Sequence, residues 1–97
     1  MTLDEEATPG KIRNTALGFL TGREFSRFEL EAKLGKRYDN NEVIKVVLDK
    51  LIEDGLQCDY RYTGAFVRSR ILRGHGPARI RLDIAQKGIN SALLFRV

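Results

Sequence analysis

The chain repeats itself at an offset of 50 residues, and this internal repeat constrains the fold more than any other feature of the sequence. Both copies read as a long helix, a tight turn, a short helix, a second turn and another helix. Small helical repeats of this kind bury their cores against each other. We therefore predict an all-α fold of two tandem three-helix repeats, with about six helices in an elongated array. The positions that align are Ala16 with Phe66, Leu17 with Val67, Ser26 with Gly76, Leu30 with Ile80, Leu34 with Ile84, Asn41 with Ser91, Val43 with Leu93 and Ile44 with Leu94.

The helix boundaries are clearest in the first copy. Apolar spacing predicts a helix over 11–21, which Gly22 ends. Ser26 and Glu29 have the spacing of a capping box, in which each side chain accepts a hydrogen bond from the other residue's amide. This box opens a helix that ends near residue 37. The strongest apolar pattern follows and runs to Asp54, with Gly55 in the C′ position of that third helix.

The second copy is less regular. Asp59 can cap a fourth helix that runs to about residue 73 and carries apolar residues on two opposite sides, so we expect it to be packed between neighbours. Pro77 suits the first turn of a fifth helix, because its missing amide proton has no helical partner there. Gly88 ends that helix, and a sixth begins at residue 90 or 91.

These elements suggest three segments. We expect a flexible acidic leader over 1–10, a first three-helix repeat over 11–56 and a second over 57–97. The last helix stops about one turn before a helix of ordinary length would end. The second repeat therefore looks truncated, and repeat architecture predicts a further unit after it.

Charge is distributed unevenly along the chain. Residues 1–10 carry −3 and residues 11–59 hold nine basic and nine acidic groups. Residues 60–88 hold seven basic groups and one acidic group, a net +6. Such a patch suits a partner that presents phosphates or carboxylates, since arginine binds both in bidentate fashion. The alternative is a solvated basic face. The seven basic residues are Arg61, Arg68, Arg70, Arg73, Arg79, Arg81 and Lys87.

No residue constellation of an enzyme is evident, and we predict a binding protein. His75 lies between two glycines without a Cys or carboxylate neighbour, which is typical of a turn residue. No His/Cys cluster has zinc spacing, and no phosphate-binding loop follows a strand. A single cysteine, Cys58, gives no disulfide framework and fits the cytoplasm. Neither a signal peptide nor a membrane-spanning segment is apparent.

Four stretches of the second copy resemble the central signature of the RecX regulatory proteins. They are Asp59-Tyr60-Arg61-Tyr62, Ala65-Phe66-Val67-Arg68-Ser69-Arg70, Gly74-His75-Gly76-Pro77-Ala78-Arg79-Ile80-Arg81 and Gln86-Lys87-Gly88-Ile89. In the first copy, residues 23–30 and 33–34 are similar to that family's N-terminal repeat. The sequence departs from the pattern at Tyr38, where glycine is usual, at Cys58, and in the absence of a third repeat.

The resemblance implies a bacterial modulator of the recombinase RecA, with a role in recombination, DNA repair and the SOS response. Such proteins bind along the RecA–DNA filament and restrain strand exchange, ATP hydrolysis and co-protease activity, and they need no cofactor. For this chain it implies a monomer that contacts RecA and single- or double-stranded DNA through the seven basic residues named above.

A second hypothesis remains open from the residues alone. The first three helices can be interpreted as a helix-turn-helix, with residues 57–62 as the wing strand of a winged-helix transcriptional regulator. The two-sided apolar pattern of residues 59–73 argues against that wing. A scaffold fragment without a partner of its own is a third alternative.

Overall fold

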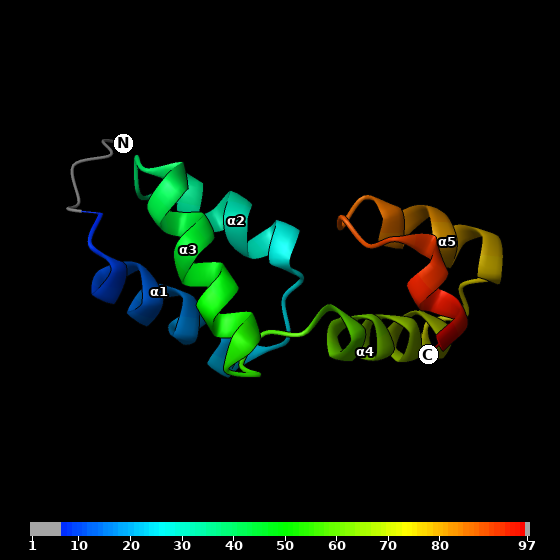
Figure 1. Ribbon diagram of the computed structural model, residues 1–97. Coiled ribbons are helices and arrows are strands. Elements are labelled where there is room, and N and C mark those ends of the chain that lie inside the picture. The colour runs from blue at the N-terminus through cyan, green and yellow to red at the C-terminus, as the bar shows by residue number, and fades with distance from the viewer. Residues whose placement is uncertain (1–6, 97) are drawn as a thin grey trace.

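Five α-helices and one 3₁₀ helix form two three-helix units (Figure 1). The computed structural model describes residues 7–96. The first unit contains α1 (Pro9–Gly22), α2 (Arg27–Gly35) and α3 (Asn41–Glu53), and the second contains α4 (Asp59–Leu72), α5 (Pro77–Ala85) and η1 (Ser91–Arg96). The units lie side by side along one axis, and the molecule measures 43 × 30 × 22 Å. The predicted all-α, elongated fold is confirmed.

The 50-residue offset holds at the level of the helices. α1 and α4 each contain 14 residues, α2 and α5 each contain nine, and both later helices begin 50 positions after their counterparts. The third pair differs: α3 has 13 residues, whereas η1 begins 50 positions later and is a 3₁₀ helix of six residues. The sixth helix is therefore present, but it has the tighter helical form that occurs in short segments.

Local capping chemistry fixes the helix boundaries of the first unit. α1 begins at Pro9, two residues before the predicted start, because Thr8 caps it and Pro9 fits its first turn. The predicted capping box of α2 is confirmed: Ser26 Oγ accepts from the Glu29 amide at 3.1 Å, and Glu29 Oε1 accepts from the Ser26 amide at 3.1 Å. Gly55 follows α3 with a φ of 75° and ends it as expected. Most of the predicted leader over 1–10 lies outside the described residues.

Each unit has its own apolar core, and the two cores differ in size. The first core is built from ten buried residues of α1–α3 and their turns, including Tyr38, whose hydroxyl lies 2.7 Å from Thr15 Oγ1. This tyrosine fills the core at the turn where the family pattern has glycine. The second core has five buried residues: Tyr62, Phe66, Ile80, Ile84 and Ile89. Since apolar burial supplies most of the folding free energy, the first unit is the stronger scaffold.

Two predictions for α4 are wrong. Its cap position is occupied by Cys58, whose side chain makes no cap hydrogen bond, whereas Asp59 is the first helical residue. The helix is also not packed on both sides along its whole length: Ile71 is 60% and Leu72 88% exposed, because the short η1 covers only part of the helix. The winged-helix hypothesis fails for a related reason, since residues 59–62, which would form the wing, are the first turn of α4.

A polar joint connects the two units. Asp59 Oδ1 accepts hydrogen bonds from the Arg27 amide and from Gln57 Nε2, both at 3.0 Å, and Gln57 Nε2 also donates to the Phe25 carbonyl at 3.0 Å. Gln57 is 2% exposed and its bond to the Phe25 carbonyl is buried, where an unpaired amide would be costly. The carboxylate that was expected to cap its own helix therefore holds the start of α2 instead.

Gly88 lies where the two units come close together. It has a φ of 76°, and a Cβ at this position would lie 2.5 Å from the Cβ of Phe28 in α2. Only glycine satisfies both constraints without a shift of one unit against the other. The presence of glycine at signature position 88 is thus explained in part by Phe28 of the neighbouring unit.

Within residues 7–96, no helix is sufficiently long and apolar to cross a membrane.

The Gly88 contact predicts a specific stability difference. Gly74→Ala, at a φ of 83° with no atom within 4 Å of the added Cβ, should cost only the backbone strain of about 1–2 kcal/mol. Gly88→Ala should lower the free energy of unfolding by about 1–3 kcal/mol more, because it adds an overpacked contact with Phe28. Urea unfolding of the two variants measures the difference. Equal losses of unfolding free energy at Gly74 and Gly88 would show that the contact with Phe28 adds no cost.

Candidate functional site

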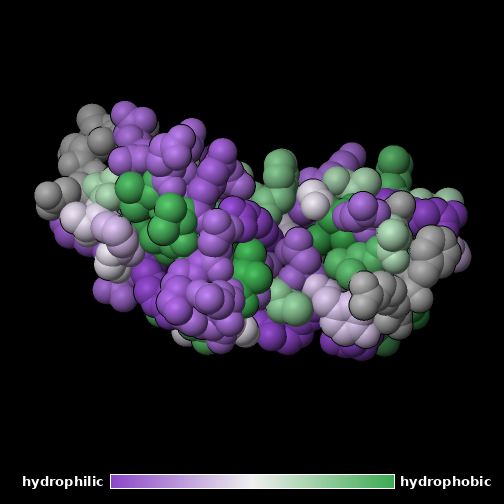
Figure 2. Space-filling model, in the orientation of Figure 1, coloured by the Kyte–Doolittle hydropathy of each residue, from purple (hydrophilic) through white to green (hydrophobic). Residues whose placement is uncertain are grey.

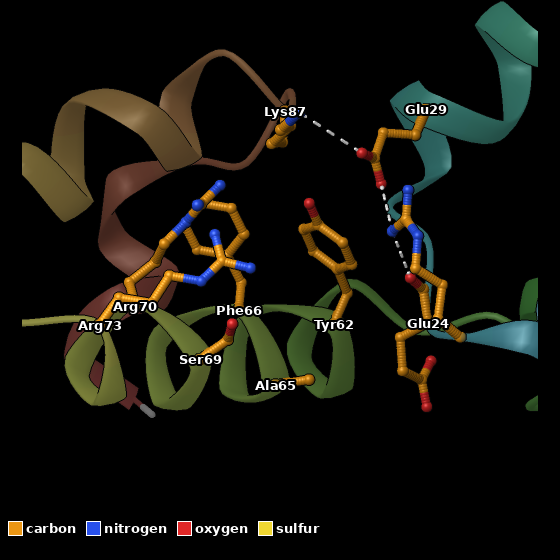
Figure 3. A pocket seen from close by; sticks show the side chains of 10 residues that line it. Glu24, Glu29, Tyr62, Ala65, Phe66, Ser69, Arg70, Arg73 and Lys87 are labelled. Atoms are coloured by element: carbon orange, nitrogen blue, oxygen red, sulfur yellow. Dashed lines mark hydrogen bonds and ion pairs between the residues drawn. The ribbon is translucent and has the colours of Figure 1, made fainter. Parts of the chain in front are cut away.

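A cleft opens where the two units meet, with α4 as its floor (Figure 3). Its volume is about 380 Å³. The walls come from the residues that precede and begin α2 on one side and from the turn after α5 on the other. The charged residues that line it are Arg23, Arg70, Arg73 and Lys87, together with Glu24 and Glu29. The cleft therefore combines side chains from both units and has more positive than negative charge.

Glu29 organises one wall of the cleft. Besides the Ser26 amide, its carboxylate contacts Arg23 Nη1 at 3.4 Å and Lys87 Nζ, from the second unit, at 3.6 Å. Burial raises the pKa of this carboxyl, but the Ser26 amide, Arg23 and Lys87 together outweigh burial, so the pKa lies below its ordinary value of 4.5. Glu29 is accordingly ionised at neutral pH and bridges the two units.

Tyr62 lies on the floor of the cleft, beneath Glu29. Its side chain points upward from α4 toward that carboxylate, and the residue is 4% exposed (Figure 3). Burial, and then the negative charge of Glu29, raise the pKa of the phenol to about 12. The hydroxyl is therefore neutral at physiological pH, and its aromatic face packs 5.9 Å from that of Phe66, measured between ring centroids. Tyr62 and Phe66 therefore belong to the core of the second unit.

Three of the seven predicted basic residues line the cleft. Arg70 and Arg73 rise from α4 toward Lys87, which lies on the opposite wall (Figure 3). The Arg70 guanidinium lies 4.4 Å from the ring centroid of Phe66, and this cation–π contact holds it in place. Lys87 is paired with Glu29, as described above.

The other four predicted basic residues lie outside the cleft. Arg61 belongs to the joint: its Nε contacts Glu24 Oε2 at 2.8 Å, and its Nη atoms donate to two backbone carbonyls at 3.3 Å. Arg79 pairs with Asp83 at 3.6 Å, as the i,i+4 spacing suggested. Arg68 and Arg81 are exposed, and neither side chain has an ionic or hydrogen-bond partner among residues 7–96. The structure therefore separates the seven residues into three groups: those that line the cleft, those outside it that are paired with a carboxylate, and those outside it without a partner among residues 7–96.

Arg81 lies at the edge of the apolar side of α5, next in sequence to the buried Ile80. The side chain is exposed at the rim of an apolar hollow of about 280 Å³ that Val67, Ile71 and Ile80 help to line. Figure 2 shows apolar residues reaching the surface in patches among hydrophilic ones on both units. The arginine thus keeps its charged head in water while its stem borders apolar surface.

Sequence reasoning missed the contribution of the first unit. Arg23, Glu24 and Glu29 form one wall of the cleft, although the first copy was interpreted as a neutral structural unit. One signal was available: the box residue Glu29 aligns with Arg79 at the 50-residue offset, so the charge reverses between the copies.

Neither His75 nor Cys58 belongs to a cluster that could hold a metal ion in the described part of the chain. No group of three or more His, Cys, Asp or Glu side chains is placed to hold a metal ion among residues 7–96. His75 occupies the turn between α4 and α5, as predicted, and burial followed by the charge of Arg79 lowers its pKa. Cys58 is a half-buried free thiol at the cap of α4.

Comparison with known proteins identifies the family. Residues 59–94, which span α4, α5 and the start of η1, match the family model described as RecX, second three-helix domain. The chain is 45% identical over 83 residues to Regulatory protein RecX of Pseudomonas putida strain W619, covering 86% of this chain and 53% of that protein. The chain belongs to the RecX family. Regulatory protein RecX of Pseudomonas syringae pv. tomato strain DC3000 is likewise 45% identical over 85 residues, covering 88% of this chain and 55% of the relative.

The chain spans slightly more than half the length of these RecX relatives. These relatives are named as regulatory proteins, in keeping with the prediction of a binding protein rather than an enzyme. The matched segment begins at the first residue of α4, so the RecX signature and the second structural unit coincide.

The lowered pKa of Glu29 predicts acid sensitivity. A carboxyl whose folded-state pKa is depressed contributes stability above its unfolded pKa, here about 4.5, and loses it as pH falls through the folded value. Unfolding in urea at about pH 7 and about pH 3 should show a large loss for the unmodified chain. Glu29→Gln keeps the box hydrogen bond but not the charge, so it should be less stable at pH 7 and less sensitive to acid. Glu42→Gln, an exposed residue of α3, is the control, and equal pH dependence in both variants would contradict the role of Glu29.

Proposed function

We propose that this chain binds the RecA–DNA nucleoprotein filament and restrains RecA activity, including its ATP hydrolysis. The observation that carries the proposal is the match of residues 59–94, most of the second unit, to the RecX family model, in the segment where the basic residues are concentrated. The relatives are regulatory proteins by name, and RecA is the target that the family resemblance implies.

The charge distribution supports this proposal. Arg68, Arg73 and Arg81 are exposed, and their side chains are without ionic partners within residues 7–96. Arginine that is not engaged internally can form bidentate contacts with phosphates or carboxylates. Arg61 and Lys87 are engaged in the joint, so we assign them to holding the units rather than to the partner.

The shape of the molecule supports it as well. A nucleoprotein filament presents phosphates and acidic protein surface in one groove, and an array 43 Å long and 22 Å thick with a basic second half suits such a groove. We propose in addition that the chain acts as a monomer, with residues 11–56 and 57–97 as its two repeats, and that the second repeat also contacts DNA.

The test is RecA ATP hydrolysis on single-stranded DNA with added protein. We expect the chain to slow hydrolysis and Arg68→Glu with Arg70→Glu to raise the concentration needed for half of the effect by about tenfold, which corresponds to about 1.4 kcal/mol. Lys36→Glu with Lys45→Glu changes the charge equally on exposed residues of the first unit and should have a much smaller effect. The full-length Pseudomonas putida relative serves as the positive control.

Two results would overturn the proposal. One is an unchanged hydrolysis rate at saturating chain while the relative inhibits under the same conditions. The other is equal weakening by the second-unit and first-unit variants, which would mean that general positive charge rather than the second unit makes the contact.

A further inference from the structure

We propose that the cleft between the two units binds carboxylate side chains of an acidic protein segment, with Arg70 and Arg73 as the residues that receive them. Both arginines are among the basic residues of the second repeat that we propose contact the RecA–DNA filament. Its ligand chemistry rests on the geometry of the cleft, and only the identity of the partner as a component of the RecA filament rests on the proposed function.

The two arginines form a pair on one face of α4. They are three positions apart, a spacing that places side chains next to each other on a helix. Figure 3 shows both guanidiniums directed into the space below Lys87. Arg70 is held against the ring of Phe66 at 4.4 Å, so part of the entropy cost of ordering its side chain is already met.

The internal charges of the cleft leave this pair unmatched. Glu29 is contacted by Arg23 and Lys87, and Glu24 by Arg61. Among residues 7–96, no carboxylate lies within ion-pair distance of Arg70 or Arg73. Each carboxylate on the walls is thus paired with arginine or lysine. The two guanidiniums on the floor have no carboxylate partner among residues 7–96.

The cleft favours an acidic protein segment over a nucleic acid strand for two reasons. Its aromatic floor cannot stack on bases, since Tyr62 is 4% and Phe66 9% exposed and Arg70 covers the latter ring. A regular phosphate backbone would also pass close to Glu24 and to the ionised carboxylate of Glu29 on the wall, which would repel it. Single acidic side chains avoid that wall, and a volume of about 380 Å³ accommodates a few of them.

Lys87 links occupancy of the cleft to the joint. Its contact with Glu29, at 3.6 Å, is longer than that of Arg23 with the same carboxylate, at 3.4 Å. Figure 3 shows Lys87 above the floor from which both arginines rise, so a carboxylate held by Arg70 and Arg73 would approach the ammonium group that contacts Glu29. All three basic residues belong to the second unit, so a bound carboxylate should compete with Glu29 for Lys87, the residue that connects this unit to the first.

The experiment measures binding of a fluorescein-labelled oligoglutamate peptide to the full chain by fluorescence anisotropy. Arg70→Gln with Arg73→Gln should raise the Kd at least tenfold, because both guanidiniums are lost. Lys36→Gln with Lys45→Gln removes the same charge from exposed residues of the first unit and should raise it less than threefold. Circular dichroism of each variant confirms that the helices are intact, and a labelled oligothymidylate is measured in parallel.

Three outcomes would overturn the proposal: no peptide binding by the unmodified chain, equal weakening in both double variants, or loss of oligothymidylate binding alone in the Arg70/Arg73 variant. The last would assign the cleft to nucleic acid. Failure here is distinct from failure of the proposed function. The peptide assay contains no RecA, and slowed RecA ATP hydrolysis without peptide binding would sink only this inference.

Discussion

The arrangement of the two units depends on the contacts that the carboxylate of Glu29 makes within its own unit and with the other. This carboxylate closes the capping box that starts α2, and the same group pairs with Arg23 of its own unit and with Lys87 of the other. A local helix signal and a long-range contact therefore share one side chain. Because exposed ion pairs contribute little on their own, the joint needs the buried hydrogen bonds of Gln57 and Asp59 and the close contact of Gly88 with Phe28 as well. Together these contacts shape the cleft above α4.

The two units have kept one plan while their chemistry has diverged. At the 50-residue offset, Tyr38 aligns with Gly88: the tyrosine fills the first core, and the glycine leaves room for Phe28 of the neighbouring unit. Glu29 aligns with Arg79, so a residue that binds the other unit has a counterpart of opposite charge that faces outward. The first unit has the larger core and provides a scaffold, whereas the second has a smaller core and the basic surface. A repeat that forms a directional joint must break its own symmetry in this way.

Most of the fold could be predicted from the sequence because most of it is set locally. Apolar periodicity and caps located the first five helices, and the repeat offset located the units. The errors arose where tertiary contacts decide. Asp59 has the composition of a cap, yet its carboxylate serves the Arg27 amide 32 positions away. The apolar residues at the end of α4 indicated burial, but the short 3₁₀ helix does not cover them. Arg23, Glu24 and Glu29 escaped the site prediction because nothing in their spacing indicates which of them meet the second unit.

The distribution of the seven basic residues shows why net charge alone is a poor guide to a binding surface. Arg61 pairs with Glu24, Lys87 with Glu29 and Arg79 with Asp83. Part of the positive charge is therefore neutralised by ion pairs within the molecule. Arg68, Arg70, Arg73 and Arg81 remain, and they divide between an outer face and the cleft. The outer arginines lie in water and can attract phosphates or carboxylates at long range, which affects mainly the rate of encounter. Arg70 is half-buried and packed on Phe66, and Arg73 lines the same cleft, so both charges act over a short distance on a ligand that enters it. A regulator that must recognise a filament rather than any polyanion needs the second kind of contact in addition to the first.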